Sequence, residues 1–167
     1  MLLKDLVTIK GGKRLPKGKM LVQYKTAHPY IKVKDMEFKT IEINSTFEYV
    51  EEDIFQSIKR YTVESGKVIL SIVGTIGNVS IVGDTLNNAS LTENCVKFDC
   101  NKMLLSKYLF YFLCSRKGQI EIQNGVVGTT QPKLPIYNIE KININVPSIE
   151  QQQHIVNTTS SLLLKSL

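Results

Sequence analysis

Two apolar, β-branched runs in the middle of the chain restrict its fold strongly. They occupy residues 67–73 and 79–82, and the residues between them are Gly74-Thr75-Ile76-Gly77-Asn78. β-Branched residues favour strands, and glycine permits the positive φ angles that tight reversals use. We therefore predict two strands joined by a turn with a constrained tip.

Other segments add strands and helices to this pair. Residues 29–35, 95–99 and 139–146 alternate apolar with polar side chains, which is typical of strands. From Met103, apolar residues recur at helical spacing, and Arg116-Lys117-Gly118 indicates the end of that helix. Residues 2–9 fit a strand or a helical turn, and residues 48–58 a weak helix or an irregular connection. The prediction is an α+β fold, a small mixed β-sheet with covering helices.

The C-terminal segment has the pattern of a helix that packs against another helix. Ser148 precedes Gln151 by three residues, the spacing of a capping box. Gln152 and Thr159 interrupt the apolar stripe that follows. A seven-residue repeat suggests a partner helix, and we expect this helix to continue beyond Leu167. The candidate partner-helix residues are Ile149, Ile155, Val156, Leu162 and Leu163.

The charge of the chain is concentrated at one end. The net charge is +6, yet residues 1–39 carry ten basic and three acidic side chains, whereas the remainder carries eleven basic and twelve acidic ones. Residues 11–19 combine glycines and a proline with basic residues, so we predict an exposed loop. The candidates for phosphate contact are Lys13, Arg14, Lys17 and Lys19, with Lys32 and Lys34 second. Charge alone leaves an ordinary lysine-rich surface equally open.

Catalytic motifs fit the sequence poorly. A phosphate-binding P-loop needs four residues between its glycines, whereas Gly12 and Gly18 enclose five, and Met20 stands where a hydroxyl is required. Glu37 and Lys39 could belong to a metal-dependent nuclease, but only Asp35 and the distant Asp5 could accompany them. A solvated strand end is the simpler interpretation.

Histidine and cysteine chemistry is also poorly supported. His28 and His154 lie far apart and neither has a neighbouring nucleophile. Cys95, Cys100 and Cys114 form no C-x-x-C pair, so we expect small core residues and no metal site. The sequence has neither a signal peptide nor a membrane-spanning run, and we expect a soluble, cytoplasmic protein without a membrane partner.

Five blocks along the chain resemble one protein family. They are residues 29–36, 66–77, 91–95, 128–134 and 146–151. In this order they are similar to the recurring blocks of type I restriction-modification specificity subunits. Their combined coverage of nearly the whole chain makes the resemblance specific.

The resemblance implies a non-catalytic DNA-recognition module. Residues 1–147 would be the target-recognition domain, and residues 148–167 the start of a long ruler helix that dimerises and sets a spacing. Double-stranded DNA would be bound at one half of a bipartite site. Partners would be the methyltransferase and restriction/translocase subunits, which would hold S-adenosylmethionine, ATP and magnesium; this chain would bind no cofactor. A second specificity half would be joined in cis or as a homodimer. The chain would then be a natural half-subunit, a fragment of a longer polypeptide or part of a fused enzyme.

Two polar loops are the candidates for contact with base edges, because glutamine pairs well with adenine and lysine with guanine. The candidate residues are Thr75, Asn78, Thr129, Thr130, Gln131 and Lys133. Thr92, Glu93 and Asn94 either join them or tie a turn together. Two alternatives from other classes are the metal-dependent nuclease and a protein-interaction module that does not bind DNA.

Overall fold

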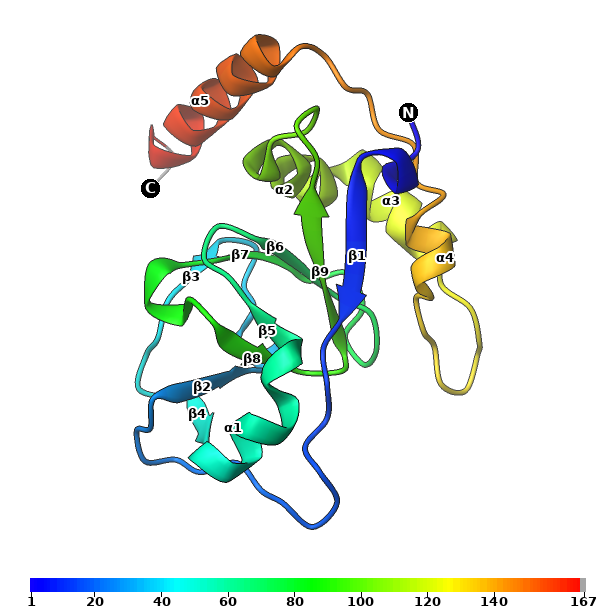
Figure 1. Ribbon diagram of the computed structural model, residues 1–167. Coiled ribbons are helices and arrows are strands. Elements are labelled where there is room, and N and C mark those ends of the chain that lie inside the picture. Colours follow the sequence, from blue (N-terminus) through cyan, green and yellow to red (C-terminus); the bar gives the residue numbers. More distant parts are fainter. Residues whose placement is uncertain (166–167) are drawn as a thin grey trace.

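The computed structural model describes the backbone of residues 1–165 and the side chains of residues 1–162. Within this part of the chain, the strands form two mixed sheets (Figure 1). The first has the order β1 (Val7–Gly11), β9 (Cys95–Cys100), β6 (Val68–Ser71), β7 (Val79–Val82) and β3 (Thr40–Ile41). The second has the order β4 (Glu48–Val50), β2 (His28–Ile31), β8 (Ala89–Leu91) and β5 (Thr62–Val63).

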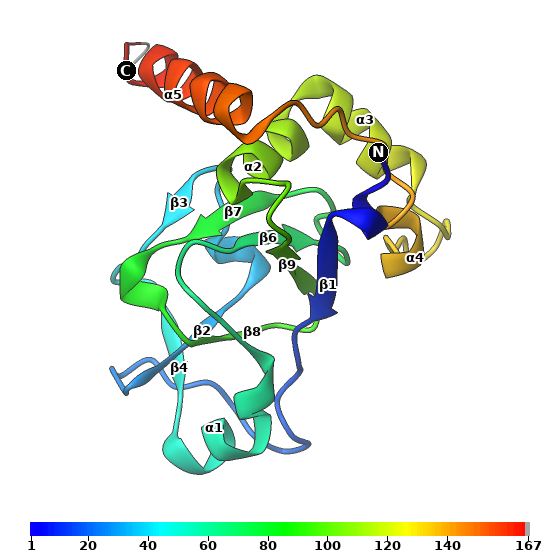
Figure 2. The same ribbon diagram turned by 45° about the horizontal axis from the view of Figure 1, so that its top comes forward.

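The helices lie at opposite ends of these sheets (Figures 1 and 2). The α-helices are α1 (Glu52–Ile58), α2 (Ser106–Cys114), α3 (Arg116–Asn124), α4 (Ile136–Ile139) and α5 (Ile149–Lys165). Short 3₁₀ helices occupy Leu3–Asp5, Val33–Asp35, Lys59–Tyr61 and Asp84–Leu86. Helix α1 lies beside the four-stranded sheet, and α2, α3 and α4 lie beside the five-stranded sheet.

Three apolar clusters fill the spaces between the sheets and the helices. Strand β6 shows how: Val68 and Leu70 pack with α2 and α3, whereas Ile69 packs with strands of the second sheet. A central strand buried on both faces reads as a continuous apolar run, which is what residues 68–70 show. A third cluster joins the outer face of the four-stranded sheet to α1, through Tyr30 and Ile54.

The predicted α+β class, with covering helices and a long C-terminal helix, is confirmed. The predicted hairpin is present as the antiparallel pair of β6 and β7, and the strand predicted at 95–99 is β9. The strands form two mixed sheets where one was expected. Both sheets contain β-branched runs, and sequence periodicity does not reveal which runs share a sheet.

The strand predicted over residues 139–146 is wrong. Residues Ile136–Ile139 form α4, and the segment after it is extended with a single β-bridge, between Leu2 and Asn143. Ile142 and Ile144 are buried because the first residues of the chain pair with this segment. The amide of Leu3 donates to the carbonyl of Ile142 at 2.9 Å. Alternating burial therefore arises here without membership of a sheet.

The predicted end of the helix after Met103 is also wrong. Helix α2 ends at Cys114, and Arg116-Lys117-Gly118 begins α3. The side chain of Ser115 accepts a hydrogen bond from the Gly118 amide at 3.1 Å and so caps the new helix. A basic pair followed by glycine is usual at a helix end, but the serine cap before it decides the outcome.

Strand β2 is shorter than the predicted strand over 29–35. It ends at Ile31, and a 3₁₀ turn follows, in which the Asp35 carboxylate accepts from the Lys32 amide at 2.8 Å. Two other segments each had two predicted conformations, and the structure decides between them. Residues 2–9 contain a 3₁₀ turn and most of β1, and residues 48–58 contain β4 and α1.

Helix α5 packs against α2. Its capping box is confirmed, since Ser148 and Gln151 exchange hydrogen bonds. Gln152 is fully buried, accepts from the Leu105 amide at 2.9 Å and donates to the carbonyls of Met103 and Pro147, both at 2.9 Å. The glutamine that interrupts the apolar stripe thus fixes the helix to its own domain.

Candidate nucleic-acid interface

The basic loop, residues 12–19, is fixed at its base to the turn between β8 and β9. The amide of Gly12 donates to the Cys95 carbonyl at 3.0 Å, and the amide of Lys13 to the Leu91 carbonyl at 2.8 Å. The Tyr30 hydroxyl also donates to the carbonyl of Lys13 at 2.8 Å. On the loop's side these bonds use only backbone groups, and the basic side chains of the loop are exposed.

The four basic side chains of this loop remain accessible. Arg14 lies 3.9 Å from Glu93 and Lys19 lies 3.7 Å from Asp53, and their side chains are 77% and 50% exposed. Among the described side chains, no carboxylate pairs with Lys13 or Lys17. Exposed ion pairs contribute only about 0–1 kcal/mol, so phosphate oxygens could replace these carboxylates at little cost.

Lys32 and Lys34 have a different setting. The Lys32 ammonium lies 3.4 Å from Asp35 and 3.9 Å from Glu48, and its side chain is 18% exposed. Lys34 is 63% exposed and lies 3.6 Å from the same glutamate. Lys32 therefore balances internal carboxylates, whereas Lys34 can still reach a partner.

The two segments predicted to contact bases lie side by side (Figure 1). A β-bridge joins Val73, at the β6–β7 tip, to Lys133, in the loop 125–134. The Leu134 amide also donates to the Ile72 carbonyl at 2.9 Å. Thr75 and all four loop candidates are exposed, and Asn78 is half-buried; the loop candidates are Thr129, Thr130, Gln131 and Lys133.

The turn of residues 91–95 connects this pair of segments to the basic loop. Besides its bonds to the loop base, its Asn94 carbonyl accepts from the Ile72 amide at 2.8 Å. Thr92 is buried, and its carbonyl accepts from the Cys95 amide at 3.2 Å. Of the two interpretations of residues 92–94, the geometry supports the structural one, with Glu93 facing Arg14. Three segments distant in sequence are thus joined by backbone hydrogen bonds.

A further basic segment was missed in the sequence. The 3₁₀ helix Lys59–Tyr61 brings the Tyr61 ring beneath the Lys13 ammonium, 5.5 Å from the ring centroid, in a cation–π contact. Lys59 and Arg60 are exposed beside it. A basic pair followed by an aromatic residue was a usable signal, but the acids of residues 51–53 cancel it in a charge count by segment.

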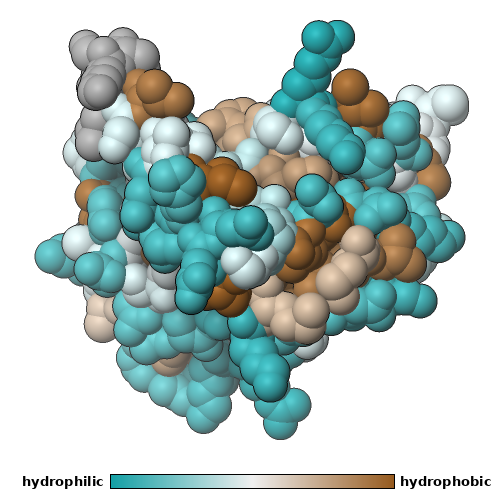
Figure 3. Space-filling view, turned by 90° about the horizontal axis from the view of Figure 1, so that it is seen from above, coloured by the Kyte–Doolittle hydropathy of each residue, from teal (hydrophilic) through white to brown (hydrophobic). Residues whose placement is uncertain are grey.

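The predicted partner-helix residues do not share one face. Val156 is 3% exposed and packs against the chain's own domain, whereas Ile155 is 40% and Leu162 61% exposed. Ile149, 40% exposed, lines a hollow with Met103 and Pro147. Leu163 lies outside the residues whose side chains are described. Figure 3, the view from above, shows apolar surface in separate patches among hydrophilic side chains.

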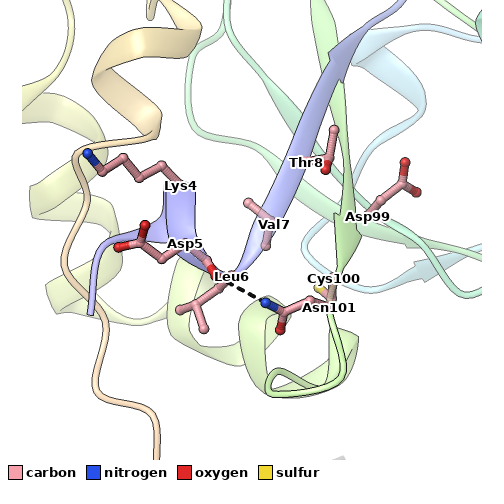
Figure 4. A pocket seen from close by; sticks show the side chains of 8 residues that line it. All are labelled: Lys4, Asp5, Leu6, Val7, Thr8, Asp99, Cys100 and Asn101. Atoms are coloured by element: carbon pink, nitrogen blue, oxygen red, sulfur yellow. Dashed lines mark hydrogen bonds between the residues drawn. The ribbon is translucent and has the colours of Figure 1, made fainter.

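The hollow beside β1 does not gather catalytic groups. Its volume is about 400 Å³, and it is lined by residues 4–8 and 99–101. Figure 4 shows Asp5 and Asp99 pointing to opposite sides, while the Asn101 side-chain amide donates to the Asp5 carbonyl.

The candidate nuclease pair does not belong to a metal site. Glu37 and Lys39 form an ion pair at 2.8 Å. Across residues 1–162, no three His, Cys, Asp or Glu side chains converge on a metal position.

His28, Cys95 and Cys114 have structural surroundings. His28 stacks on Phe55 with ring centroids 3.7 Å apart and contacts Glu52 at 2.5 Å. This hydrogen bond from His28 lowers the pKa of Glu52. Burial raises the pKa of the Cys95 and Cys114 thiols to about 12, so both are protonated at neutral pH and lack the thiolate that a nucleophile needs.

Within the described part of the chain, none of the helices combines the length and the apolar character that a bilayer crossing requires.

Comparison with known proteins gives a consistent result. The family model described as "Type I restriction modification DNA specificity domain" matches residues 1–165. A putative type I restriction enzyme specificity subunit of Haemophilus influenzae is 30% identical over 112 residues. That alignment covers 65% of this chain and 28% of the relative, so the chain spans well under half of its relative's length.

Solved structures share the fold. A chain from a study of complex assembly and conformational transition of the type I R-M system has a TM-score of 0.75 at 13% identity, covering 98% of this chain and 37% of that chain. The S subunit from M. genitalium has a TM-score of 0.68 at 16% identity, covering 96% and 37%. The HsdS subunit from Thermoanaerobacter tengcongensis has a TM-score of 0.67 at 12% identity, covering 98% and 36%.

Proposed function

The chain belongs to the type I restriction-modification DNA specificity family, and we propose that it is a target-recognition unit that binds one half of a split DNA site. One observation carries this proposal. The basic loop, the β6–β7 tip and the loop 125–134 are joined by backbone hydrogen bonds through the turn of residues 91–95. DNA recognition needs both kinds of group that this surface combines, because phosphate contacts set position and base contacts set sequence.

The phosphate contacts are assigned to the accessible cations. Lys34 is a second candidate, and the internal ion pairs of Lys32 make it a poor one. Lys59 and Arg60 join the set because the Tyr61 ring beside them contacts Lys13. The principal phosphate ligands are Lys13, Arg14, Lys17 and Lys19. The base-edge candidates are Thr75, Asn78, Thr129, Thr130, Gln131 and Lys133.

The chain divides into a recognition part, residues 1–147, and a spacer helix that starts in residues 148–167. The exposed Ile155 and Leu162 suit a contact with the helix of a second specificity half. That half would be supplied in cis or by a second copy, and a symmetric pair would bind a palindromic split site. Methyltransferase and restriction/translocase subunits would assemble on the complete subunit.

The chemistry belongs to the partners. In this family the specificity subunit is non-catalytic and binds no cofactor, and its partner subunits use S-adenosylmethionine and ATP. Magnesium would likewise act there. Because its DNA target lies inside the cell, the complex would act in the cytoplasm. The residues of this chain bind and orient DNA, and they transfer no group.

The test is to co-express the full-length gene product with its methyltransferase and to map methylated sites across the genome. A bipartite motif is expected, and Gln131→Ala and Lys133→Ala should relax or change only one half of it. Lys141→Ala, at an exposed lysine beside α4, is the matched control and should leave the motif intact. Absence of a complex, or a motif that none of the loop substitutions alters, contradicts the proposal.

A further inference from the structure

The β6–β7 tip has a backbone that is fixed from within. Gly77 has a φ of +101°, a conformation that side chains other than glycine's rarely adopt. The Ser71 hydroxyl accepts from the Asn78 amide at 2.9 Å and donates to the Thr75 carbonyl at 2.5 Å. The candidate base-contacting side chains of Thr75 and Asn78 therefore project from a defined turn.

Gln119 holds the same tip from outside. Its side-chain amide nitrogen donates to the Gly77 carbonyl at 3.0 Å and to the Leu113 carbonyl at 2.7 Å. The nitrogen has two hydrogens, so these two bonds use its whole capacity to donate. Leu113 lies in the last turn of α2, where carbonyls lack helical partners. One side chain thus ties the tip to the junction of α2 and α3.

The start of α3 places Gln119 in reach of the tip. The preceding residue, Gly118, lies so close to α2 that a Cβ atom there would be 2.0 Å from the Phe112 carbonyl oxygen. Any larger residue would force the two helices apart. The Ser115 cap fixes the same turn.

Helix α3 also carries the second base-contacting segment. It ends at Asn124, and the loop 125–134 begins at the next residue. The Asn138 side chain donates to the Gly125 carbonyl at 2.8 Å and anchors the start of that loop. Helix α3 therefore contacts the tip through Gln119 and leads directly into the loop.

We propose that Gln119 is a positioning residue for sequence discrimination, which holds the β6–β7 tip in register with the loop 125–134. This inference rests on the proposed function. Gln119 need not touch DNA, and it acts by keeping two sets of hydrogen-bonding groups at a fixed separation. Its loss should therefore reduce discrimination between sequences and leave the phosphate contacts intact.

The experiment uses the full-length protein in complex with its methyltransferase. The preferred sequence is first selected from random duplex DNA with the wild type. Affinities are then measured for that site, for single-base variants within the half-site and for unrelated DNA. Gln119→Leu removes both hydrogen bonds. Gln123→Leu is the matched control, because Gln123, one turn later on the same helix, also lies beside Gly77 but forms no side-chain hydrogen bond with the tip in the described part of the chain.

For Gln119→Leu we expect preference for the selected site to fall roughly tenfold, with unchanged affinity and salt dependence on unrelated DNA. Gln123→Leu should match the wild type. If Gln119→Leu fails to fold, Gln119→Met keeps the length of the side chain without the donor, and Gln123→Met becomes its control. Wild-type discrimination in the Gln119 variant, or equal loss in the Gln123 variant, overturns the inference alone. A wild type without any sequence preference overturns the proposed function and this inference together.

Discussion

The loop end of the molecule comprises the basic loop, the β6–β7 tip and the loop 125–134. Its segments are joined by backbone bonds, such as that from the Ile72 amide to the Asn94 carbonyl, and their side chains face outward. At the helix end, which comprises α2 and α5, the side chains of Gln152 and Val156 hold α5 on α2. The difference explains which end can vary. Loop side chains can change without loss of the joints between loops, whereas the side chains under α5 are themselves the joint.

Gln152→Leu, in the joint between α5 and α2, should have the largest effect on stability. The Leu105 amide and the Met103 and Pro147 carbonyls would lose their shared partner, and buried polar groups without partners cost about 1–3 kcal/mol each. We expect the free energy of unfolding to fall by about 3 kcal/mol in urea denaturation. Gln153→Leu, at the exposed neighbour, should change it by less than about 0.5 kcal/mol. Equal effects at the two positions would show that α5 is not docked as described.

Val156→Ala tests the apolar part of the same joint. Removing two buried methyl groups should lower the free energy of unfolding by roughly 1–2.5 kcal/mol. Ile155→Ala, on the outward side, should leave the stability of the isolated chain nearly unchanged and weaken association with a second specificity half. Sedimentation equilibrium would measure that association. A destabilised Ile155→Ala monomer would contradict the assignment of the two sides.

Lys17→Gln tests the loop end. It should lower the affinity for every DNA sequence alike and reduce the slope of log K against log salt by about 0.9, because one phosphate contact is lost. Fluorescence anisotropy at several salt concentrations measures both quantities. Lys107→Gln removes another exposed lysine, on α2 at the helix end, and should leave the slope unchanged. If both variants alter the slope equally, the DNA surface is not confined to the loop end.

Glu93→Gln should have the smallest effect. It removes the carboxylate 3.9 Å from Arg14, and an exposed pair contributes less than about 1 kcal/mol to folding. Stability should therefore change little, while affinity for DNA rises a few-fold because the carboxylate no longer competes with phosphate. A fall in affinity would mean that Glu93 orients Arg14 for binding.

Local elements were predictable where neighbouring residues decide them. The hairpin of β6 and β7 followed from two β-branched runs around a glycine-containing turn, and the start of α5 followed from Ser148 and Gln151. The segment 139–146 was not predictable in this way. Its alternating burial depends on pairing with residues 1–4, more than 130 residues away in the sequence.

The candidate site shows the same division. The basic loop and both polar loops were identified from composition, but their assembly through the turn of residues 91–95 was not. Tyr61 and Arg60 were missed because the nearby acids cancel their segment's charge. In the folded chain the Tyr61 ring nevertheless contacts the Lys13 ammonium. Gln119 and Gln152 were also missed, since a glutamine that bonds to backbone groups of distant segments has no local signature.

By itself the sequence determined the α+β class, the hairpin, the capped C-terminal helix and the concentration of positive charge in residues 1–39. These depend on φ preferences, side-chain shape and spacing along the chain. Tertiary structure alone decided that the strands form two sheets, that Lys32 is held by internal carboxylates and that Val156 faces its own domain. Those outcomes depend on contacts between distant segments, whose partners are chosen only when the chain packs.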